Sequence, residues 1–374
     1  MKSIFKIALL LTISFTFYAC PSDDEGTSYE VRDRATVYEE NKIEIEEYLK
    51  SNYMTIGANN EVTVTEIPEG GTQTSIWDQY KSPDFGNEVP FITVKNDTRA
   101  TYLTDGRIND DVDYKLHYIV LAEGNGTTPK SVDSTFVAYK GWNLKNVVFD
   151  QNNTGTWFSF PDTNTSISGF RQILSTIKTA SSVTEDTYGN LNYNDAGNVI
   201  VFIPSGLAYF NSGNSNIGAY APIAFQIKLF ALKERNHDYD GVPSKYEDFS
   251  YDNDGNVFHN IPDGNYFNDD TDGDKIPDFL DNEDDGDGFL TKYEVRFGIT
   301  SGTAPNEVTT YYYYPFIGAA IDDPATPYDD RRGIPRKFTG PLNPNLPSAL
   351  ESDYTDTVRL RRHLDKTCKP PYQD

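Results

Sequence analysis

The middle of the chain alternates apolar and polar residues in short runs, a pattern typical of half-buried β-strands. The clearest run covers 114–121, and 223–229 alternates Ile, Phe, Ile and Leu with Ala, Gln and Lys. The continuous apolar run 198–203 predicts a strand buried on both faces. Further strands are predicted at 135–141, 146–150 and 157–160.

One helix is predicted inside this series of strands. Between 169 and 178, apolar residues recur with the i, i+3, i+4, i+7 spacing of a single helical face. These residues are Phe170, Ile173, Leu174 and Ile177. Strands that wrap one short helix define an α+β domain, which we place at 113–232.

The regions on either side of this domain are less regular. Apolar residues spaced among glutamates predict one short helix at 36–51. Residues 20–112 otherwise comprise a polar tether and short β-rich runs broken by Gly, Pro and Asn, for which we predict no fold. Residues 296–374 are rich in Pro, Tyr and Thr and likewise carry no predicted fold.

The N-terminus has the pattern of an export signal. Two lysines precede an apolar run at 7–19, which is shorter than the roughly 20 residues that a transmembrane helix needs. Residues 17–20 resemble a lipobox, which implies a signal peptide at 1–19 and lipid attachment at Cys20. The acidic stretch 21–25 resembles the export tag of surface lipoproteins in Bacteroidota. We therefore expect a lipid-anchored envelope protein at the outer membrane, with the leaflet left open; secretion with a free Cys20 is the alternative.

The net charge limits the kinds of molecule that the protein is expected to bind. The 374 residues carry 32 Lys and Arg against 57 Asp and Glu, a net charge of −25, which argues against nucleic-acid binding. Two cysteines exclude a disulfide scaffold or a cysteine-based zinc site. Residues 236–295 hold 18 Asp and Glu against three Lys, so more than half of the net charge lies there.

Within this acidic segment, three frames of twelve residues follow the pattern of calcium loops. Such loops place side-chain oxygens at positions 1, 3, 5 and 9, a carbonyl at 7, glycine at 6 and an acid at 12. The predicted ligands are Asn236, Asp238, Asp240, Val242 through its carbonyl, Ser244 and Glu247; Asp270, Asp272, Asp274, Asp278 and Asp281; and Glu283, Asp285, Asp287, Thr291 and Glu294.

The second frame fits less well than the others. Lys275 takes the position that favours a positive φ, and the twelfth ligand is the short Asp281. Pro243 and Pro277 stand where a helix-flanked EF-hand loop has a β-branched residue, so the set resembles thrombospondin type 3 repeats more closely. A solvated acidic linker is the alternative, but such linkers do not repeat Asp-x-Asp with glycine in phase. We expect calcium here to be structural.

The 113–232 domain resembles the FKBP-type peptidyl-prolyl cis-trans isomerases over about 120 residues. The matching motifs keep the family's order and spacing except for one insertion at 181–197. They are Val137-Ala138-Tyr139-Lys140-Gly141, Val148-Phe149-Asp150, Phe158-Ser159-Phe160, Ile167-Ser168-Gly169-Phe170, Ile203-Pro204-Ser205-Gly206-Leu207-Ala208-Tyr209 and 223–229.

The resemblance implies an antiparallel half-barrel sheet wrapped on one short helix, and a proline-binding pocket. Its walls would be Tyr139, Phe149, Phe158 (or Trp157 if the register slips), Ile167, Phe170, Tyr209, Ile217 and Phe225, with Asp150 as the pocket carboxylate. The Tyr209 hydroxyl would donate to the substrate carbonyl. Three positions depart from the family: Phe170 replaces the tryptophan at the base, Phe210 replaces a glycine, and Gly218-Ala219 replaces the Pro-Pro of the rim.

These observations predict an anchored prolyl isomerase that acts on proline-containing exported polypeptides. Neither His117 nor His237 has the Ser or Cys context of a hydrolase. The three departures from the family leave an alternative function: an FKBP-like binding module or chaperone with weak turnover. A second alternative is a calcium-dependent surface protein with a structural role only.

Overall fold

The structure is a computed structural model that divides into residues 1–32 and residues 33–374, and every described helix and strand lies in the second unit. The predicted signal peptide and Cys20 lie outside the described residues. No described helix is both long enough and apolar enough to cross a membrane. The described residues are 30–99, 108–161, 166–213, 216–251, 257–258, 264–316, 321, 324–325, 331, 333–335 and 360–369.

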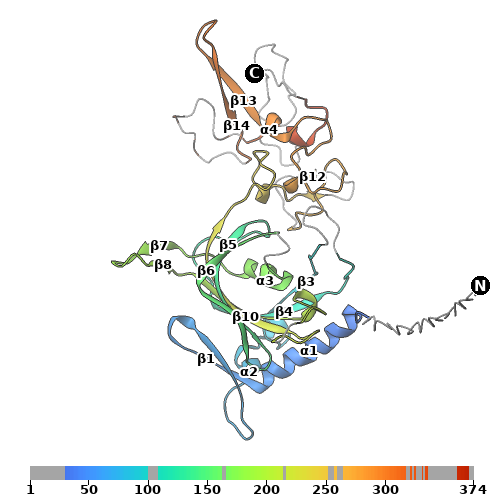
Figure 1. The fold of residues 1–374 in the computed structure, drawn as a ribbon, viewed down its shortest axis with the longest axis vertical. Helices are drawn as coiled ribbons and strands as arrows, with labels where there is room; N and C mark the ends of the chain where they lie inside the picture. The colour runs from blue at the N-terminus through green and yellow to red at the C-terminus, as the bar shows by residue number, and fades with distance from the viewer. Residues whose placement is uncertain are drawn as a thin grey trace, which may run out of the picture. The chain divides into compact units, whose positions relative to one another are not determined.

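A six-stranded sheet organises the middle of the chain (Figure 1). Its order is β3-β4-β9-β10-β5-β6, and every neighbouring pair is antiparallel. The strands are β3 (Phe91–Val94), β4 (Tyr114–Ala122), β5 (Ser134–Asn143), β6 (Val148–Ser159), β9 (Gly197–Ile203) and β10 (Ile223–Lys233).

The sheet curves around one short helix, α3 (Ser168–Ile173), which continues as a 3-10 turn at Leu174–Thr176 (Figure 1). Phe170, Ile173 and Leu174 on this helix are almost fully buried and pack against inward residues such as Val137 and Val201. The α+β class and the antiparallel sheet around a single short helix are thus confirmed.

The N-terminal region covers the opposite face of this sheet. It consists of α1 (Arg34–Ser51), the hairpin of β1 (Asn52–Ile56) and β2 (Val62–Glu66), and α2 (Ile76–Tyr80). Its buried residues Ile45, Leu49, Val62 and Ile76 form a second core with outward sheet residues, among them Phe202. Burying both faces explains why β9 is apolar throughout.

The structure contains the predicted helices and strands, with bounds that differ by a few residues. The helix predicted at 36–51 is α1, and its first turn is capped by Asp33, whose carboxylate accepts from the Thr36 N–H. The strands predicted at 146–150 and 157–160 were wrongly separated, since β6 runs through both. As the edge strand it carries polar residues on both faces, so its middle lacks the alternation that predicts a strand.

Three smaller strand pairs make up the rest of the described β-structure. The insertion forms a hairpin of β7 (Ser182–Glu185) and β8 (Leu191–Asn194). In the acidic segment, β11 (Ser250–Tyr251) pairs with β12 (Val257–Phe258), and α4 (Thr291–Glu294) ends the last loop. The strands β13 (Arg296–Ser301) and β14 (Val308–Tyr313) then pair, next to a small core that includes Val242, Val295 and Phe316.

Candidate functional site

Five aromatic rings converge between α3 and the concave side of the sheet, and we call them the aromatic cluster: Tyr139, Phe149, Phe158, Phe170 and Phe225. Phe170 lies at its centre, with ring centroids 5.8 Å from Tyr139, 5.4 Å from Phe158 and 5.2 Å from Phe225. All three contacts are edge-to-face, the arrangement that the ring quadrupoles favour. Phe170 and Phe225 are 4% exposed, whereas the other three are half-buried.

Glycine is required where β5 passes beneath this cluster. A Cβ built on Gly141 would lie 2.5 Å from the Phe225 ring and 2.7 Å from the Phe149 ring. Both distances are far below van der Waals contact. The missing side chain therefore lets two rings of the cluster lie directly against the strand.

Polar groups stand at the open side of the cluster. The Tyr139 hydroxyl donates to the Asp150 carboxylate at 2.9 Å. Burial, followed by this hydrogen bond, raises the pKa of Tyr139 to about 12. Burial and the nearby Asp150 charge also raise the pKa of Tyr209, which is 38% exposed. Both tyrosines therefore keep their protons at neutral pH and can act as hydrogen-bond donors.

The loop that carries Tyr209 is held by α1. The Asn41 side chain accepts from the Ser205 N–H at 2.8 Å and donates to the Tyr220 carbonyl at 2.9 Å, so it fixes both ends of the loop. The Arg34 guanidinium lies 4.1 Å from the centre of the Phe210 ring. Phe210 has a φ of +44°, a left-handed conformation that glycine adopts more readily than other residues.

The structure also places the remaining residues predicted for the site. Ile217 is buried in the same core as the cluster, and Ile167 packs against that core. Of the two alternatives Phe158 and Trp157, only Phe158 lies in the aromatic cluster. Trp157 is 50% exposed and packs instead against Phe136, with ring centroids 5.3 Å apart.

The three acidic loops share one backbone geometry. In each, the N–H of the second residue donates to the ninth side chain: His237 to Ser244, Thr271 to Asp278, and Asp284 to Thr291. The sixth residue has a positive φ in every loop, including Lys275 at +80°. The repeat predicted from the sequence is therefore a structural repeat as well.

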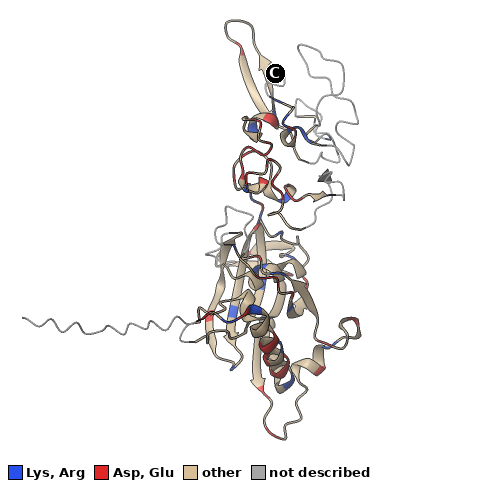
Figure 2. Cartoon of the chain, turned by 90° about the vertical axis from the view of Figure 1, so that its right-hand side faces the viewer, with Lys and Arg blue, Asp and Glu red and all other residues tan. Residues whose placement is uncertain are grey.

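Carboxylates gather in three groups along these loops. In Figure 2, acidic residues follow one another closely along this segment. Within each group, one oxygen per residue lies within 4.8 Å of the others. Two groups follow the predicted frames. The third adds a residue that the frames did not include, Asp284. The groups are Asp270, Asp272 and Asp274; Glu283, Asp285 and Asp287; and Asp238, Asp240, Glu247 and Asp284.

The group that contains Asp284 has the properties of a cation site. Glu247 and Asp284 are each 1% exposed, and neither carboxylate has a hydrogen-bond partner in the described part of the chain. Burial, followed by repulsion from neighbouring carboxylates such as Asp238 and Asp240, raises the pKa of both carboxyls well above the usual range. Buried charges without partners cost several kcal/mol each, so these residues fit a cation that would neutralise them. Carboxylate oxygens are the donors that calcium prefers.

The other predicted ligands are not in these groups. Asp278 is buried, and its carboxylate accepts from the Thr271 N–H and hydroxyl. Asn236 accepts from the Tyr239 N–H at 2.6 Å, which tightens the first loop. Their role as ligands, like that of Val242, Ser244, Asp281, Thr291 and Glu294, stays a prediction.

Known proteins resemble parts of the chain. Residues 237–328 match a family described as BamM C-terminal, and no curated protein matches. A peptidyl-prolyl cis-trans isomerase from Pseudomonas syringae pv. tomato is 24% identical, with 32% of this chain and 76% of that chain covered. FkpA from Escherichia coli is 26% identical, with 32% of this chain and 48% of that chain covered. Both TM-scores are 0.26, so these likenesses leave the activity undecided.

Proposed function

We propose that residues 113–232 are an FKBP-type peptidyl-prolyl cis-trans isomerase. The observation that carries the proposal is the aromatic cluster, which meets Asp150 and Tyr209 at its open side. The rings come from three strands and from α3, and a six-stranded antiparallel sheet around one short helix supports them.

The chemistry requires only such a surface. Rotation about a peptide bond costs about 18–20 kcal/mol because the planar amide is stabilised by resonance. The twisted amide has less charge separation than the planar one, so a dry aromatic surface disfavours the ground state relative to it. No bond is broken, and neither a nucleophile nor a metal is needed. Lowering the barrier by about 4 kcal/mol accelerates exchange roughly a thousandfold.

The polar groups have distinct tasks in this scheme. The Tyr209 hydroxyl donates to the carbonyl oxygen of the residue before proline and fixes it while the amide turns. Asp150 accepts from Tyr139 at 2.9 Å and thereby orients that ring at the edge of the cluster. Both tyrosine hydroxyls stay protonated at neutral pH, as this role requires.

The test is exchange spectroscopy by NMR on a short peptide with one X-Pro bond. Residues 23–374 at catalytic concentration should accelerate cis-trans exchange, and Tyr209→Phe, which removes only the hydroxyl, should lower kcat/KM. Tyr188→Phe is the matched control, because Tyr188 is 90% exposed on the β7–β8 hairpin. No acceleration by folded wild-type protein would overturn the proposal.

One observation favours a second candidate, an FKBP-like binding module or chaperone with little turnover. Phe170 and Phe225 are 4% exposed, so the base of the cluster is nearly sealed by its own rings. A module of this kind would shift the peptide's resonances on binding yet leave the exchange rate unchanged. The same NMR experiment distinguishes the two candidates.

We also propose the cellular setting that the sequence predicts. The protein would be attached through lipid on Cys20 at the outer membrane and act on exported polypeptides. Stable anchoring by acyl chains follows from about 0.8 kcal/mol per buried CH₂. Fractionation of cells that express the wild type and Cys20→Ser tests this: the variant should leave the membrane fraction, and retention would contradict the anchor.

Finally, we propose calcium as a structural ligand of the loops 236–247, 270–281 and 283–294. The support is the repeated loop geometry together with three groups of carboxylates. Calcium would neutralise these charges and stiffen the segment. Loops of this type in extracellular proteins bind at about 10⁻⁴–10⁻³ M.

A further inference from the structure

We propose that a single calcium ion is held jointly by Asp238, Asp240 and Glu247 of the first loop and by Asp284 of the third. This inference rests on the proposal that the segment binds calcium, and it adds a ligand that no twelve-residue frame assigns. The ion would connect two loops that are distant in the sequence. It would therefore act as a cross-link within 236–295.

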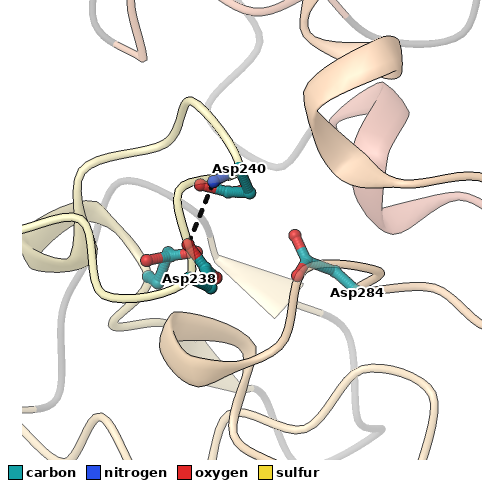
Figure 3. A group of neighbouring side chains, drawn as sticks. Asp238, Asp240 and Asp284 are labelled. Carbon is teal, nitrogen blue, oxygen red and sulfur yellow. Dashed lines mark hydrogen bonds between the residues drawn. The ribbon is translucent and has the colours of Figure 1, made fainter.

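The geometry of the four carboxylates supports a common ion. One oxygen from each lies within 4.8 Å of the others, which is the spacing of ligands around one cation. Figure 3 shows the Asp284 carboxylate reaching from its own loop towards Asp238 and Asp240. The Asp240 N–H donates to Asp238 at 3.2 Å, which orients that carboxylate within the first loop.

Burial and the lack of other partners point to the ligand independently of the cluster. Both oxygens of Glu247 and both of Asp284 are buried without a hydrogen-bond partner, as are one oxygen of Asp238 and one of Asp240. No lysine or arginine of the described residues forms an ion pair with these four carboxylates. Four oxygen-only donors from the protein suit calcium, whereas magnesium keeps several waters and uses one or two carboxylates.

Asp284 and its two neighbours in the sequence contribute to different groups. Glu283 and Asp285 belong to the third loop's own group of carboxylates, whereas the Asp284 carboxylate lies with those of the first loop. The Asp284 N–H donates to the Thr291 hydroxyl of the third loop at 3.1 Å, which holds its backbone in place. Residues 283–285 would therefore provide ligands to two ions. An ion in the third loop orders the segment that presents Asp284, so the two sites should bind with positive cooperativity.

Asp284→Asn tests the shared ion, because it removes the charge and keeps the shape. In residues 23–374 stripped with chelator, calorimetric titration with calcium should give one site weakened roughly tenfold or more. Asp272→Asn is the matched control, since Asp272 belongs to the exposed group of the second loop. It should weaken a different site.

A double-mutant cycle distinguishes a shared ion from two separate effects. Glu247→Gln and Asp284→Asn should be strongly non-additive in calcium affinity, because both act on the same ion. Asp284→Asn and Asp272→Asn should combine to within roughly twofold of the product of their separate effects. Additivity of the first pair would overturn the inference.

A stability measurement covers the case in which a variant folds poorly. Without calcium, Asp284→Asn should raise the midpoint of thermal unfolding, because it removes a buried charge that lacks a partner. With calcium, the same variant should lower the midpoint. A midpoint that moves in one direction under both conditions would overturn the shared ion. A wild type that binds no calcium would instead overturn the calcium proposal as a whole.

Discussion

Replacing Asn41 with alanine should destabilise the sheet and the loop that carries Tyr209, although Asn41 lies in α1, outside residues 113–232. The Asn41 side chain is 1% exposed and makes two hydrogen bonds, from the Ser205 N–H at 2.8 Å and to the Tyr220 carbonyl at 2.9 Å. Losing both costs about 1–3 kcal/mol, and leaving the buried Ser205 N–H unpaired adds about 1–2 kcal/mol. We expect a loss of about 2–5 kcal/mol in the free energy of unfolding.

Urea denaturation followed by tryptophan fluorescence measures this loss in the right part of the chain. All three tryptophans, Trp77, Trp142 and Trp157, lie in α2, β5 and β6, and none lies in the acidic segment. Glu47→Ala is the matched control, because Glu47 is exposed on the same helix and its removal should change stability by less than about 0.5 kcal/mol.

The same variant should reduce isomerase activity, because the loop that it releases carries Tyr209. Misplacement of that loop by about 1 Å would lower kcat/KM roughly tenfold or more. A loss of stability below about 1 kcal/mol would refute the argument that Asn41 clamps the loop. Unchanged activity in a destabilised variant would show that the clamp does not position the site.

Three further predictions concern other parts of the chain. Gly141→Ala should cost about 1–3 kcal/mol of stability, because its Cβ collides with the rings of Phe149 and Phe225; an unchanged urea midpoint would contradict this. Burial lowers the pKa of His117 in the folded protein. As the pH falls, the unfolded chain therefore binds a proton at this side chain before the folded chain does, and the free energy of unfolding should decrease below about pH 6.5. His117→Gln should flatten that dependence in urea midpoints at pH 7.5 and 5.5, and parallel curves would refute it. Chelator should accelerate limited proteolysis within 236–295, and equal cleavage rates would contradict structural calcium.

The helix and most strands of the central domain could be predicted because each carries its pattern locally. The face formed by Phe170, Ile173 and Leu174 is the face that the sheet buries. In β10, Ile223, Phe225, Ile227 and Leu229 all lie in the core around α3, as their alternation predicts. Here the local pattern and the tertiary environment agree.

Apart from α1, the N-terminal region could not be predicted, because its order depends on the sheet that it packs against. The hairpin β1–β2 buries Val62 against outward sheet residues, and the Val62 N–H donates to the Gln226 side chain at 3.1 Å. A two-stranded hairpin is marginal by itself. Nothing within 52–66 indicates the distant surface that stabilises it.

The aromatic residues of the candidate site were all named from the sequence, but one carboxylate that lies with the predicted metal ligands was missed. The resemblance to the FKBP-type isomerases named all five members of the aromatic cluster. Strand periodicity alone would not have found them, because Phe149 and Phe158 lie an odd number of residues apart in β6 and Phe170 lies on α3. Asp284 was missed because a twelve-residue frame assigns ligands within one loop. The available signal was an acid at position 2, adjacent to two predicted ligands, where the first and second loops have His237 and Thr271.

The most direct test of the central claim is the refolding of a model protein whose slow phase is limited by proline isomerisation. Residues 23–374 should accelerate that phase in calcium and in chelator alike, and Tyr209→Ala should abolish the acceleration. Such a result would establish the isomerase and confine calcium to a structural role. A folded wild-type protein that leaves the slow phase unchanged would contradict the account.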